Sequence, residues 1–201
     1  MRDVLDRYYT PRWLVEALLE KIDVGNRSVL EPCAGGGGIV LPIADRRPST
    51  LDYSDVSESA AYSGPHWDFP AHDFGDQRWD WVVTNPPYRT DRYTAADFVK
   101  KALTIADNVA MLLRITWLEP CADRAIIFDE RRPRLVLVCP RASFVSPKIG
   151  VGQRKGTTEH VTCCWYVWGP EDAYRGSDLR WVHQRDIARL SGQADLFEGD
   201  A

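Results

Sequence analysis

Four consecutive residues, Asn85-Pro86-Pro87-Tyr88, come just after an apolar run, Trp79 to Val83. Their side chains and carbonyls could hold a planar exocyclic amine, whose lone pair is delocalised into a ring and is therefore a poor nucleophile. The side-chain oxygen of Asn85 and the backbone carbonyl of Pro86 are acceptors that could bind two N–H groups and favour pyramidal geometry at that nitrogen. The prolines fix φ and remove competing donors, and Tyr88 could stack on a base taken out of its helix.

The same four residues can also form a proline turn with a surface tyrosine, because Asn-Pro pairs often mark turns. The rest of the chain bears on this alternative. The stretch VLEPCAGGGG reads as a strand ending in Glu31, followed by a glycine loop that opens a helix and lets backbone approach a ligand closely. It lacks clean G-x-G-x-x-G spacing, and the chain shows no clear nicotinamide site.

Two further carboxylates stand where a nucleoside could bind. Asp55 is expected at the end of the strand in LDYSDV, where a carboxylate can accept both hydroxyls of a ribose. Asp52, earlier in the same strand, is the competing candidate. Asp73 and Phe74 precede the strand DWVVTN. Together these residues suggest a ligand that carries adenine and ribose without requiring a phosphate.

The elements that must position these residues alternate between strand and helix. Thr10 can cap a first helix with Pro11 in its first turn. Strands are expected in RSVLEP, STLDYSDV, DWVVTN, NVAMLLRIT, RLVLVCP and EHVTCCWYVWG, and helices in IVLPIADRR, AADFVKKALTIAD and CADRAIIFDE. This alternation predicts an α/β, doubly wound, mainly parallel sheet. Ligands bind such sheets at the carboxyl ends of strands, and the unusual residues fall at those ends.

Composition limits the function classes. The chain has 201 residues, 44% hydrophobic and 27% charged, as expected of one globular domain with a sizeable core. No apolar run is long enough for a membrane span, and the N-terminus lacks the apolar core of a signal peptide, so a cytoplasmic location is expected. The five cysteines and four histidines show no metal-ligand spacing, and we expect no metal. The net charge of −4 argues against nonspecific coating of nucleic acid.

The order of the motifs resembles a known family. YYTP, LEPCAGGGG, SDV, HDF and NPPY together resemble the class I S-adenosylmethionine-dependent amino-methyltransferases of DNA. The N-terminal place of YYTP is similar to the gamma arrangement of adenine-N6 methyltransferases. RASF followed by a tryptophan-rich strand is similar to small phage and prophage enzymes. The resemblance implies a seven-stranded Rossmann-like sheet with an antiparallel last strand, and transfer of a methyl group to N6 of adenine in DNA.

The resemblance also implies roles for individual residues. Asn85, Pro86, Pro87 and Tyr88 would be the catalytic set that holds the target base. S-adenosyl-L-methionine would be the cofactor, with Asp55 on its ribose, Asp73 on its adenine amine and Phe74 against that ring. The other implied cofactor-binding residues are Tyr9, Thr10 and Pro11 at the methionine end, and Glu31, Ala34, Gly35 and Gly37 in the loop.

Several features depart from the family or leave its substrate open. Four glycines in a row exceed the usual loop and could loosen cofactor binding. The chain has no evident target-recognition domain, so DNA contacts would fall to two segments, 89–93 and 146–160, although the second can equally be a solvated surface loop. The basic residues concerned are Arg89, Arg92, Lys148, Arg154 and Lys155.

NPPY also occurs in methyltransferases of ribosomal RNA and of protein glutamine. RNA adenine or guanine and protein glutamine are therefore alternative acceptors, and a noncatalytic cofactor- or DNA-binding relic is an alternative of another class. The expected organisation is one catalytic domain, residues 1–190, and a flexible tail, 191–201. Within that tail, Gln193-Ala194-Asp195-Leu196-Phe197 resembles the short peptide with which bacterial replication proteins bind the sliding clamp.

Overall fold

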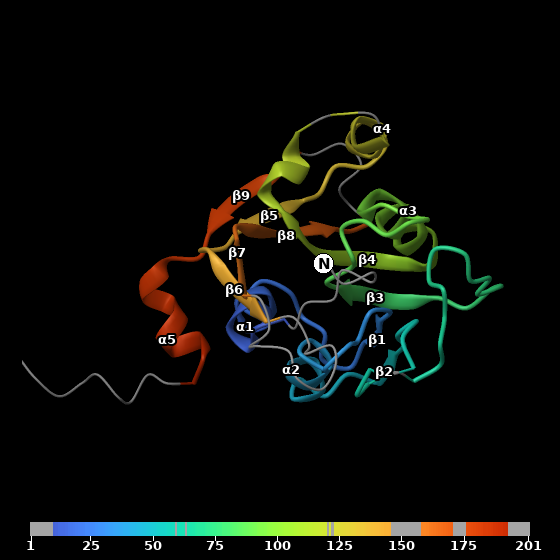
Figure 1. The fold of residues 1–201 in the computed structure, drawn as a ribbon, viewed down its shortest axis with the longest axis horizontal. Coiled ribbons are helices and arrows are strands. Elements are labelled where there is room, and N and C mark those ends of the chain that lie inside the picture. Colours follow the sequence, from blue (N-terminus) through green and yellow to red (C-terminus); the bar gives the residue numbers. More distant parts are fainter. Residues whose placement is uncertain are drawn as a thin grey trace, which may run out of the picture.

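The chain folds around a mixed, mostly parallel sheet of seven strands, as the sequence predicts (Figure 1). The computed structural model describes residues 10–58, 60–62, 64–119, 121, 123–145, 158–170 and 176–192. In spatial order, the strands are β2 (Thr50–Tyr53), β1 (Ser28–Glu31), β3 (Trp79–Thr84), β4 (Ala106–Arg114), β8 (Cys163–Trp168), β5 (Leu135–Val138) and β9 (Asp178–Trp181). The expected antiparallel strand is β8, which runs opposite to both β4 and β5.

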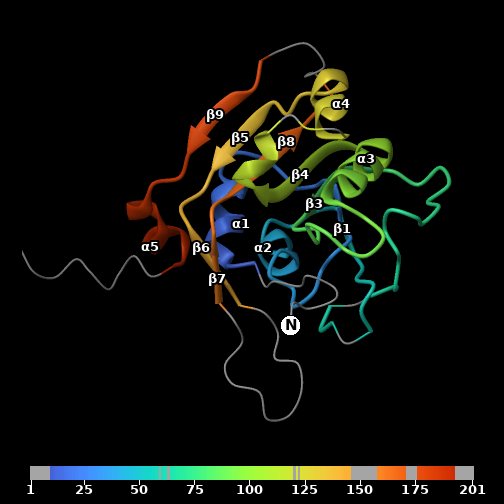
Figure 2. The same ribbon diagram turned by 45° about the horizontal axis from the view of Figure 1, so that its top comes forward.

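Helices cover both faces of this sheet, which makes the fold doubly wound (Figure 2). One face carries α1, α2 and α5, and the other carries α3 and α4. The helical elements are α1 (Arg12–Leu19), α2 (Val40–Ala44), α3 (Ala95–Ile105), α4 (Asp123–Glu130), α5 (Ile187–Leu190), and the short 3-10 helices η1 (Ile115–Leu118) and η2 (Gln184–Asp186).

The central strand β4 is apolar at successive positions, without the alternation of apolar and polar residues seen in half-exposed strands. Val109, Met111 and Leu113 are buried against the α3 face, while Ala110 and Leu112 are buried against the α1 face. Successive side chains of a strand point to opposite faces, so a strand covered on both faces must be apolar at every position. The core is therefore divided into two layers, one on each face of the sheet.

The chain order reverses between β1 and β3, which are parallel neighbours. The crossover after β1 runs through α2 on one face to β2, whereas the crossover after β3 runs through α3 on the other face to β4. Adjacent crossovers on opposite faces leave a crevice at the carboxyl ends of the two strands. Glu31 and Asn85 stand at those ends, so the fold brings the two main sequence motifs together.

Some elements differ from the prediction. The run EHVTCCWYVWG is not one strand: it is divided at Thr162 into β7 (Thr158–Val161) and β8, and β7 pairs with β6 (Ala142–Val145) in a separate two-stranded sheet. The predicted loop 146–159 therefore ends two residues too late. The polar segment after Gly169 supplies β9 and α5, because short edge elements need little apolar sequence.

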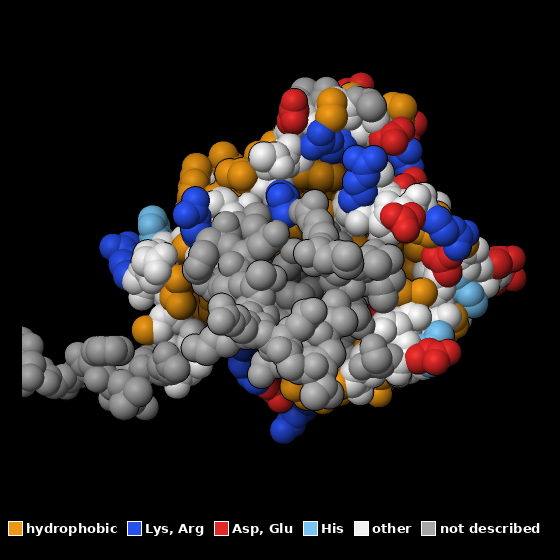
Figure 3. Space-filling view, viewed as in Figure 1, with side chains coloured by type: hydrophobic (Ala, Val, Ile, Leu, Met, Phe, Trp, Pro, Cys, Tyr) orange, Lys and Arg blue, Asp and Glu red, His pale blue; other side chains and the backbone are white. Residues whose placement is uncertain are grey.

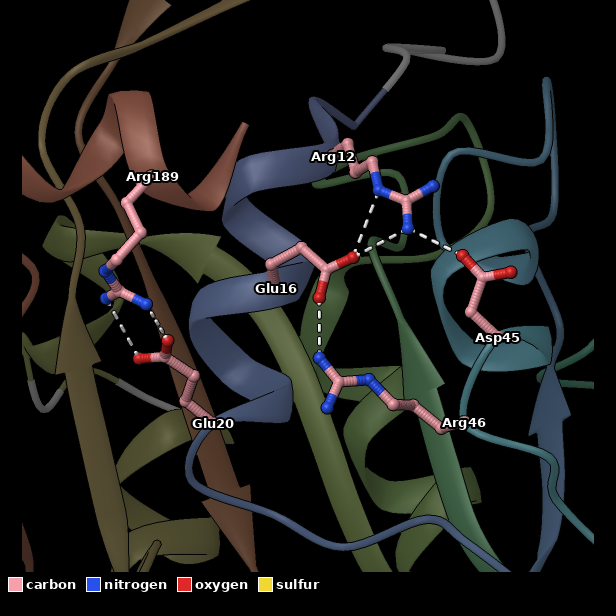
Figure 4. A network of polar contacts seen from close by, with 6 residues as sticks. All are labelled: Arg12, Glu16, Glu20, Asp45, Arg46 and Arg189. Carbon is pink, nitrogen blue, oxygen red and sulfur yellow. Dashed lines mark hydrogen bonds and ion pairs between the residues drawn. The ribbon is translucent and has the colours of Figure 1, made fainter. Parts of the chain in front are cut away.

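The first helix also begins differently. Thr10 is not its cap: Pro11 occupies the N-cap position, and no side chain bonds the first turn. Ion pairs hold α1 against its neighbours instead (Figure 4). Arg12 bonds Asp45 of the segment after α2 at 2.6 Å, and Glu16 accepts from Arg46 at 2.7 Å. Arg189 of α5 binds Glu20 just after α1.

No helix among the described residues combines the length and the apolar character needed to cross a bilayer. No group of three or more histidine, cysteine, aspartate or glutamate side chains among them could hold a metal ion. All five cysteines are unpaired thiols.

Candidate active site

Glu31 joins the two strands of the crevice. Its side chain is fully buried, and its Oε1 accepts from the Thr84 hydroxyl at 2.6 Å and from the Cys33 backbone N–H at 2.8 Å. Thr84 is the last residue of β3, so one carboxylate oxygen bridges the ends of β1 and β3. The other oxygen, Oε2, accepts no hydrogen bond from the described residues although it is buried. Such an oxygen can bond a ligand group, as an acceptor when the carboxyl is ionised and as a donor when it is protonated.

Burial governs the protonation of this carboxyl group. Loss of solvation raises the pKa of Glu31 to about 8, more than the bonds from Thr84 and Cys33 lower it, and the nearby Asp55 raises it further. The pKa of the Cys33 thiol is also raised well above its ordinary value, chiefly by burial and then by the charge of Glu31. A nucleophilic thiolate at Cys33 is therefore unfavourable.

The glycine loop is shaped by close approach of neighbouring segments. Gly35 and Gly37 have positive φ, of 49° and 80°, and a Cβ on Gly37 would overlap the ring of Tyr62. A Cβ on Gly38 would stand 2.6 Å from the backbone oxygen of Thr10. The fourth glycine thus lets the segment before α1 lie against the loop, which gives the unusual four-glycine run a steric reason.

The carboxylate of Asp55 fastens this loop to the end of β2. Oδ2 accepts from the Gly35 N–H at 2.9 Å, and Oδ1 accepts from the Ser57 N–H at 2.8 Å. The Ala34 N–H is bound as well, to the carbonyl of Ser54. Asp55 is 7% exposed, and each of its oxygens can accept a second bond.

The competing carboxylate, Asp52, has a different partner. Its Oδ2 accepts from the indole N–H of Trp79 at 2.7 Å, and Trp79 is buried at the start of β3. Asp52 lies inside β2, whose last residue is Tyr53, whereas Asp55 comes after the strand end. This geometry makes Asp52 a structural partner of Trp79 and favours Asp55 as the ligand-facing group.

Asp73 and Phe74 occupy different environments. Asp73 is exposed and accepts from the Gly75 N–H at 2.9 Å in a local turn. Phe74 is buried, with its ring 5.3 Å from that of Trp79 and 5.8 Å from that of Phe69. The structure does not show Asp73 beside Glu31 or Asp55.

Sequence reasoning did not consider the second Asp-Phe pair, Asp68-Phe69. Asp68 accepts from Arg92 at 2.8 Å and from the Tyr93 hydroxyl at 3.3 Å. It therefore ties the segment before β3 to the segment after NPPY. The repeated dipeptide in WDFPAHDF was the signal that could have identified it.

Thr10, which was expected to cap α1, instead binds Asn85 across the crevice. The Asn85 Nδ2 donates to the Thr10 hydroxyl oxygen at 3.1 Å. With its nitrogen so engaged, the amide leaves Oδ1 as the acceptor that can face a ligand. Pro86 is buried and Pro87 is partly buried. Because each proline fixes φ, the backbone carbonyl of Pro86 has a fixed position.

Tyr88 contacts the paired ends of β4 and β8. Its hydroxyl lies 3.3 Å from the Cys163 sulfur, and the Arg114 guanidinium lies 5.2 Å from its ring centroid. A cation at that distance over an aromatic face is attracted to the ring. Arg114 ends β4, and its contact with Tyr88 was not anticipated from sequence.

The residues expected to contact nucleic acid are only partly described. Arg89 and Arg92 are exposed after NPPY, Arg89 in a bridge with Thr94 and Arg92 bound to Asp68. Tyr9, Lys148, Arg154 and Lys155 lie outside the described residues, as does the segment 193–197.

Comparison with protein-family models and with curated proteins finds no match. Solved structures do match. The type I restriction-modification methyltransferase subunit of Streptococcus thermophilus has a TM-score of 0.61 at 13% identity, covering 92% of this chain and 52% of that one. The modification subunit assigned to a type I restriction enzyme of Vibrio vulnificus gives 0.62 at 14% identity, with 89% and 48% covered.

A third structure, a protein from Pyrococcus horikoshii assigned as an RNA methyltransferase, has a TM-score of 0.59 at 16% identity and covers 83% of this chain and 87% of that one. The chain has a Rossmann-like methyltransferase fold. It spans about half the length of the two modification subunits. At these identities the likeness shows the methyltransferase fold alone.

The residues of the crevice fit the cofactor that this methyltransferase fold implies. Glu31 offers a buried carboxyl oxygen without a partner in the described chain. The loop after it has backbone conformations and close contacts that a side chain would disrupt at Gly37 and Gly38. Asp55 supplies a second buried carboxylate on the next strand. Acceptors around a backbone cradle suit a ligand with a nucleoside and an amino acid end.

Proposed function

We propose that the chain is an S-adenosylmethionine-dependent N-methyltransferase that acts on the exocyclic N6 of adenine in DNA. One observation carries the proposal: Asn85-Pro86-Pro87-Tyr88 directly follows β3 at the crevice, opposite the Glu31–glycine loop, with the Asn85 nitrogen bound to Thr10. The bond to Thr10 fixes the amide and leaves its oxygen available to a ligand, which supports this proposal over a proline turn with a surface tyrosine.

Glu31, Gly35, Gly37 and Asp55 would hold the cofactor, together with Thr10 and Pro11 at the N-terminal segment. We extend the same proposal to Tyr9, Ala34, Asp73 and Phe74 from the family resemblance. When bound, S-adenosylmethionine supplies a methyl group on a sulfonium that needs no further activation. The chain's own contribution is therefore positioning, which can lower a barrier by several kcal/mol.

The acceptor base would be held by three groups. The Asn85 Oδ1 and the Pro86 carbonyl would accept from the amine, and Tyr88 would stack on the ring. Tyr88 is supported by Arg114 and Cys163, which limit the positions of its ring before any base arrives. A preset ring loses little freedom on stacking.

The choice of DNA rests on the N-terminal place of the Tyr-Thr-Pro segment and on the likeness to type I modification subunits. RNA is the second candidate acceptor, favoured by the likeness to the Pyrococcus protein. Protein glutamine is a third, because its amide nitrogen is also planar and delocalised. A noncatalytic relic would keep the fold and lose turnover.

The test is methyl transfer from labelled cofactor to DNA, RNA and release-factor protein in parallel, with wild type and Asn85→Ala. We expect methyladenine in digested DNA, weak dependence on flanking sequence, and transfer that falls steeply with salt because phosphate contacts carry much of the affinity. Asn85→Ala should abolish transfer while cofactor affinity, measured by calorimetry, stays near that of wild type.

Methyl found only on cytosine, RNA or protein would refute the DNA-adenine assignment. Undiminished turnover by Asn85→Ala on the true substrate would refute the role of Asn85. Cofactor binding by both proteins without transfer to any acceptor would favour the relic.

A further inference from the structure

The strand β9 forms one edge of the main sheet and is exposed along its whole length. Among the described strands, it pairs with β5 alone. Leu179 is 47% exposed and Trp181 is 60% exposed, which is unusual for large apolar side chains. Figure 3 shows hydrophobic side chains gathered at the upper left of the molecule, where Figure 1 places β9.

The outer edge of β9 carries backbone donors and acceptors that pair with no other strand of the described residues. The N–H groups of Asp178 and Val182 donate inward, to the carbonyls of Arg134 and Val138, at 2.7 and 2.9 Å. Backbone groups alternate in direction along a strand, so those of Leu179 and Trp181 point away from β5. An unpaired row of this kind is a template for another strand.

We propose that this edge docks a second copy of the chain, through antiparallel pairing of the two β9 strands about a twofold axis. The outward groups restrict the registers. Two registers pair Leu179 with an outward residue of β9 in the second copy: Leu179 opposite Leu179, or Leu179 opposite Trp181, which places Arg180 opposite Arg180. A register centred on Trp181 pairs Leu179 only with a residue beyond the strand. Both registers satisfy the outward hydrogen bonds, so charge decides between them.

The register centred on Leu179 is electrostatically complementary. It places Asp178 opposite Arg180 of the second copy, and Arg180 opposite Asp178, on the same face of the sheet. Opposite charges at facing positions stabilise a strand pair, whereas the alternative register brings two arginines together. In one copy, Arg180 donates to Asp178 at 2.8 Å, and both side chains are more than half exposed. Both can therefore reach across the edge.

The apolar residues also find partners in this register. Leu179 meets its own copy on the opposite face from the charges, and Trp181 stands opposite Ser177 and diagonal to Leu179. Diagonal neighbours are within reach of an aromatic side chain. The pairing spans few residues, so a weak dimer is expected, of the kind that interfaces smaller than about 1,200 Å² form.

Charged edge strands often serve to prevent pairing, which is the alternative for Asp178 and Arg180. The spacing favours pairing, because opposite charges placed symmetrically about Leu179 make the strand complementary to itself. The edge is four strands away from β3, or roughly 19 Å. Docking there leaves the crevice of each copy accessible.

Sedimentation equilibrium of the full chain over a range of concentrations tests the proposal. Wild type should dimerise reversibly. Asp178→Arg alone faces arginine with arginine, and Arg180→Asp alone faces aspartate with aspartate, so each should weaken the dimer about tenfold or more. An equimolar mixture of the two variants pairs opposite charges again and should dimerise nearly as well as wild type.

Arg27→Asp, a charge reversal at an exposed position just before β1, which is five strands away from β9, is the matched control and should leave the dimer unchanged. Leu179→Pro removes an outward N–H without touching the β5 ladder, and should abolish the dimer while circular dichroism shows a folded chain. Wild type that stays monomeric, or a mixture no tighter than its two components, would overturn the proposal. So would dimers unaffected by Leu179→Pro.

Discussion

Thr10 and Asn85 are 75 positions apart, yet the hydroxyl of one fixes the amide of the other. If Asn85 acts as proposed, Thr10 is a positioning residue. Thr10→Val keeps the side-chain volume and removes the acceptor. We expect it to lower kcat for methyl transfer about three- to tenfold, the loss that one hydrogen bond implies.

Thr10→Ser restores the hydroxyl and should restore kcat. Cofactor affinity is measured for both variants, because Thr10 also lies against the glycine loop. A Thr10→Val protein with normal kcat and weaker cofactor binding would show that the hydroxyl serves the cofactor rather than Asn85.

Glu31 makes stability depend on pH. Its pKa is about 8 in the folded chain, against an ordinary value of 4.5. Between these values the folded state keeps a proton that the unfolded state has released, so the free energy of unfolding decreases as pH rises. Glu31→Gln, an uncharged mimic of the protonated acid, should remove that slope. The free energy of unfolding of Glu31→Gln minus that of wild type should therefore be a few kcal/mol larger at pH 8 than near pH 4.

Urea denaturation of both proteins at several pH values between 4 and 9 measures this difference. A gap between variant and wild type that stays constant across the range would mean that Glu31 ionises normally. The prediction concerns the chain without ligand and does not depend on the proposed activity.

The sequence could predict which residues lie at the crevice, but it could not predict the contacts between them. Glu31 ends a strand and Asp55 and Asn85 come just after strands, so the rule that ligands bind at strand ends identifies all three. The bonds from Thr84 to Glu31 and from Asn85 to Thr10 join segments distant in sequence. Periodicity carries no information on such pairs, because it describes one segment at a time.

At the scale of elements, the end of β2 decides between two carboxylates. Asp55→Ala should weaken cofactor binding by about 1–3 kcal/mol, because it removes a partner of buried hydroxyls. Asp52→Ala should leave cofactor binding nearly unchanged and lower the free energy of unfolding by about 1 kcal/mol, because it removes the acceptor of the Trp79 N–H.

Calorimetry with the cofactor and urea denaturation measure the two effects on the same proteins. Asp55→Asn is a useful companion, since it keeps one oxygen for the Gly35 or Ser57 N–H. If Asp52→Ala proved the weaker binder of cofactor, the ligand-facing carboxylate would be the one inside the strand.

Element boundaries show where local sequence is insufficient. The strands β1, β3 and β4 were predicted because buried strands are continuously apolar. The break at Thr162 was missed, because β-branched and aromatic residues continue across it. It arises where the chain leaves the small sheet with β6 and enters the main one, a choice made by tertiary pairing.

At the scale of the whole molecule, the chain has net charge −4 and the described part shows no added recognition domain. Residence on DNA would then benefit from a tether. The segment Gln193–Phe197 resembles a clamp-binding peptide and begins three residues after α5 ends at Leu190. Arg189 binds α5 to Glu20 after α1, so such a tether would start from a fixed point on the domain.

A clamp contact through Leu196 and Phe197 in an apolar pocket, with Gln193 as a polar anchor, should be of modest affinity because a short peptide must order on binding. It would nevertheless raise the local concentration of enzyme on clamp-loaded DNA.

We expect purified sliding clamp to retain the full chain in a pulldown, and Leu196→Ala/Phe197→Ala to reduce retention to background. Glu198→Ala/Asp200→Ala, which changes the same segment outside the resemblance, is the control and should be retained as wild type. Equal retention of wild type and the Leu196/Phe197 variant, or retention of neither, would refute clamp binding through this segment. Residence on DNA would then depend on contacts made by the catalytic domain itself.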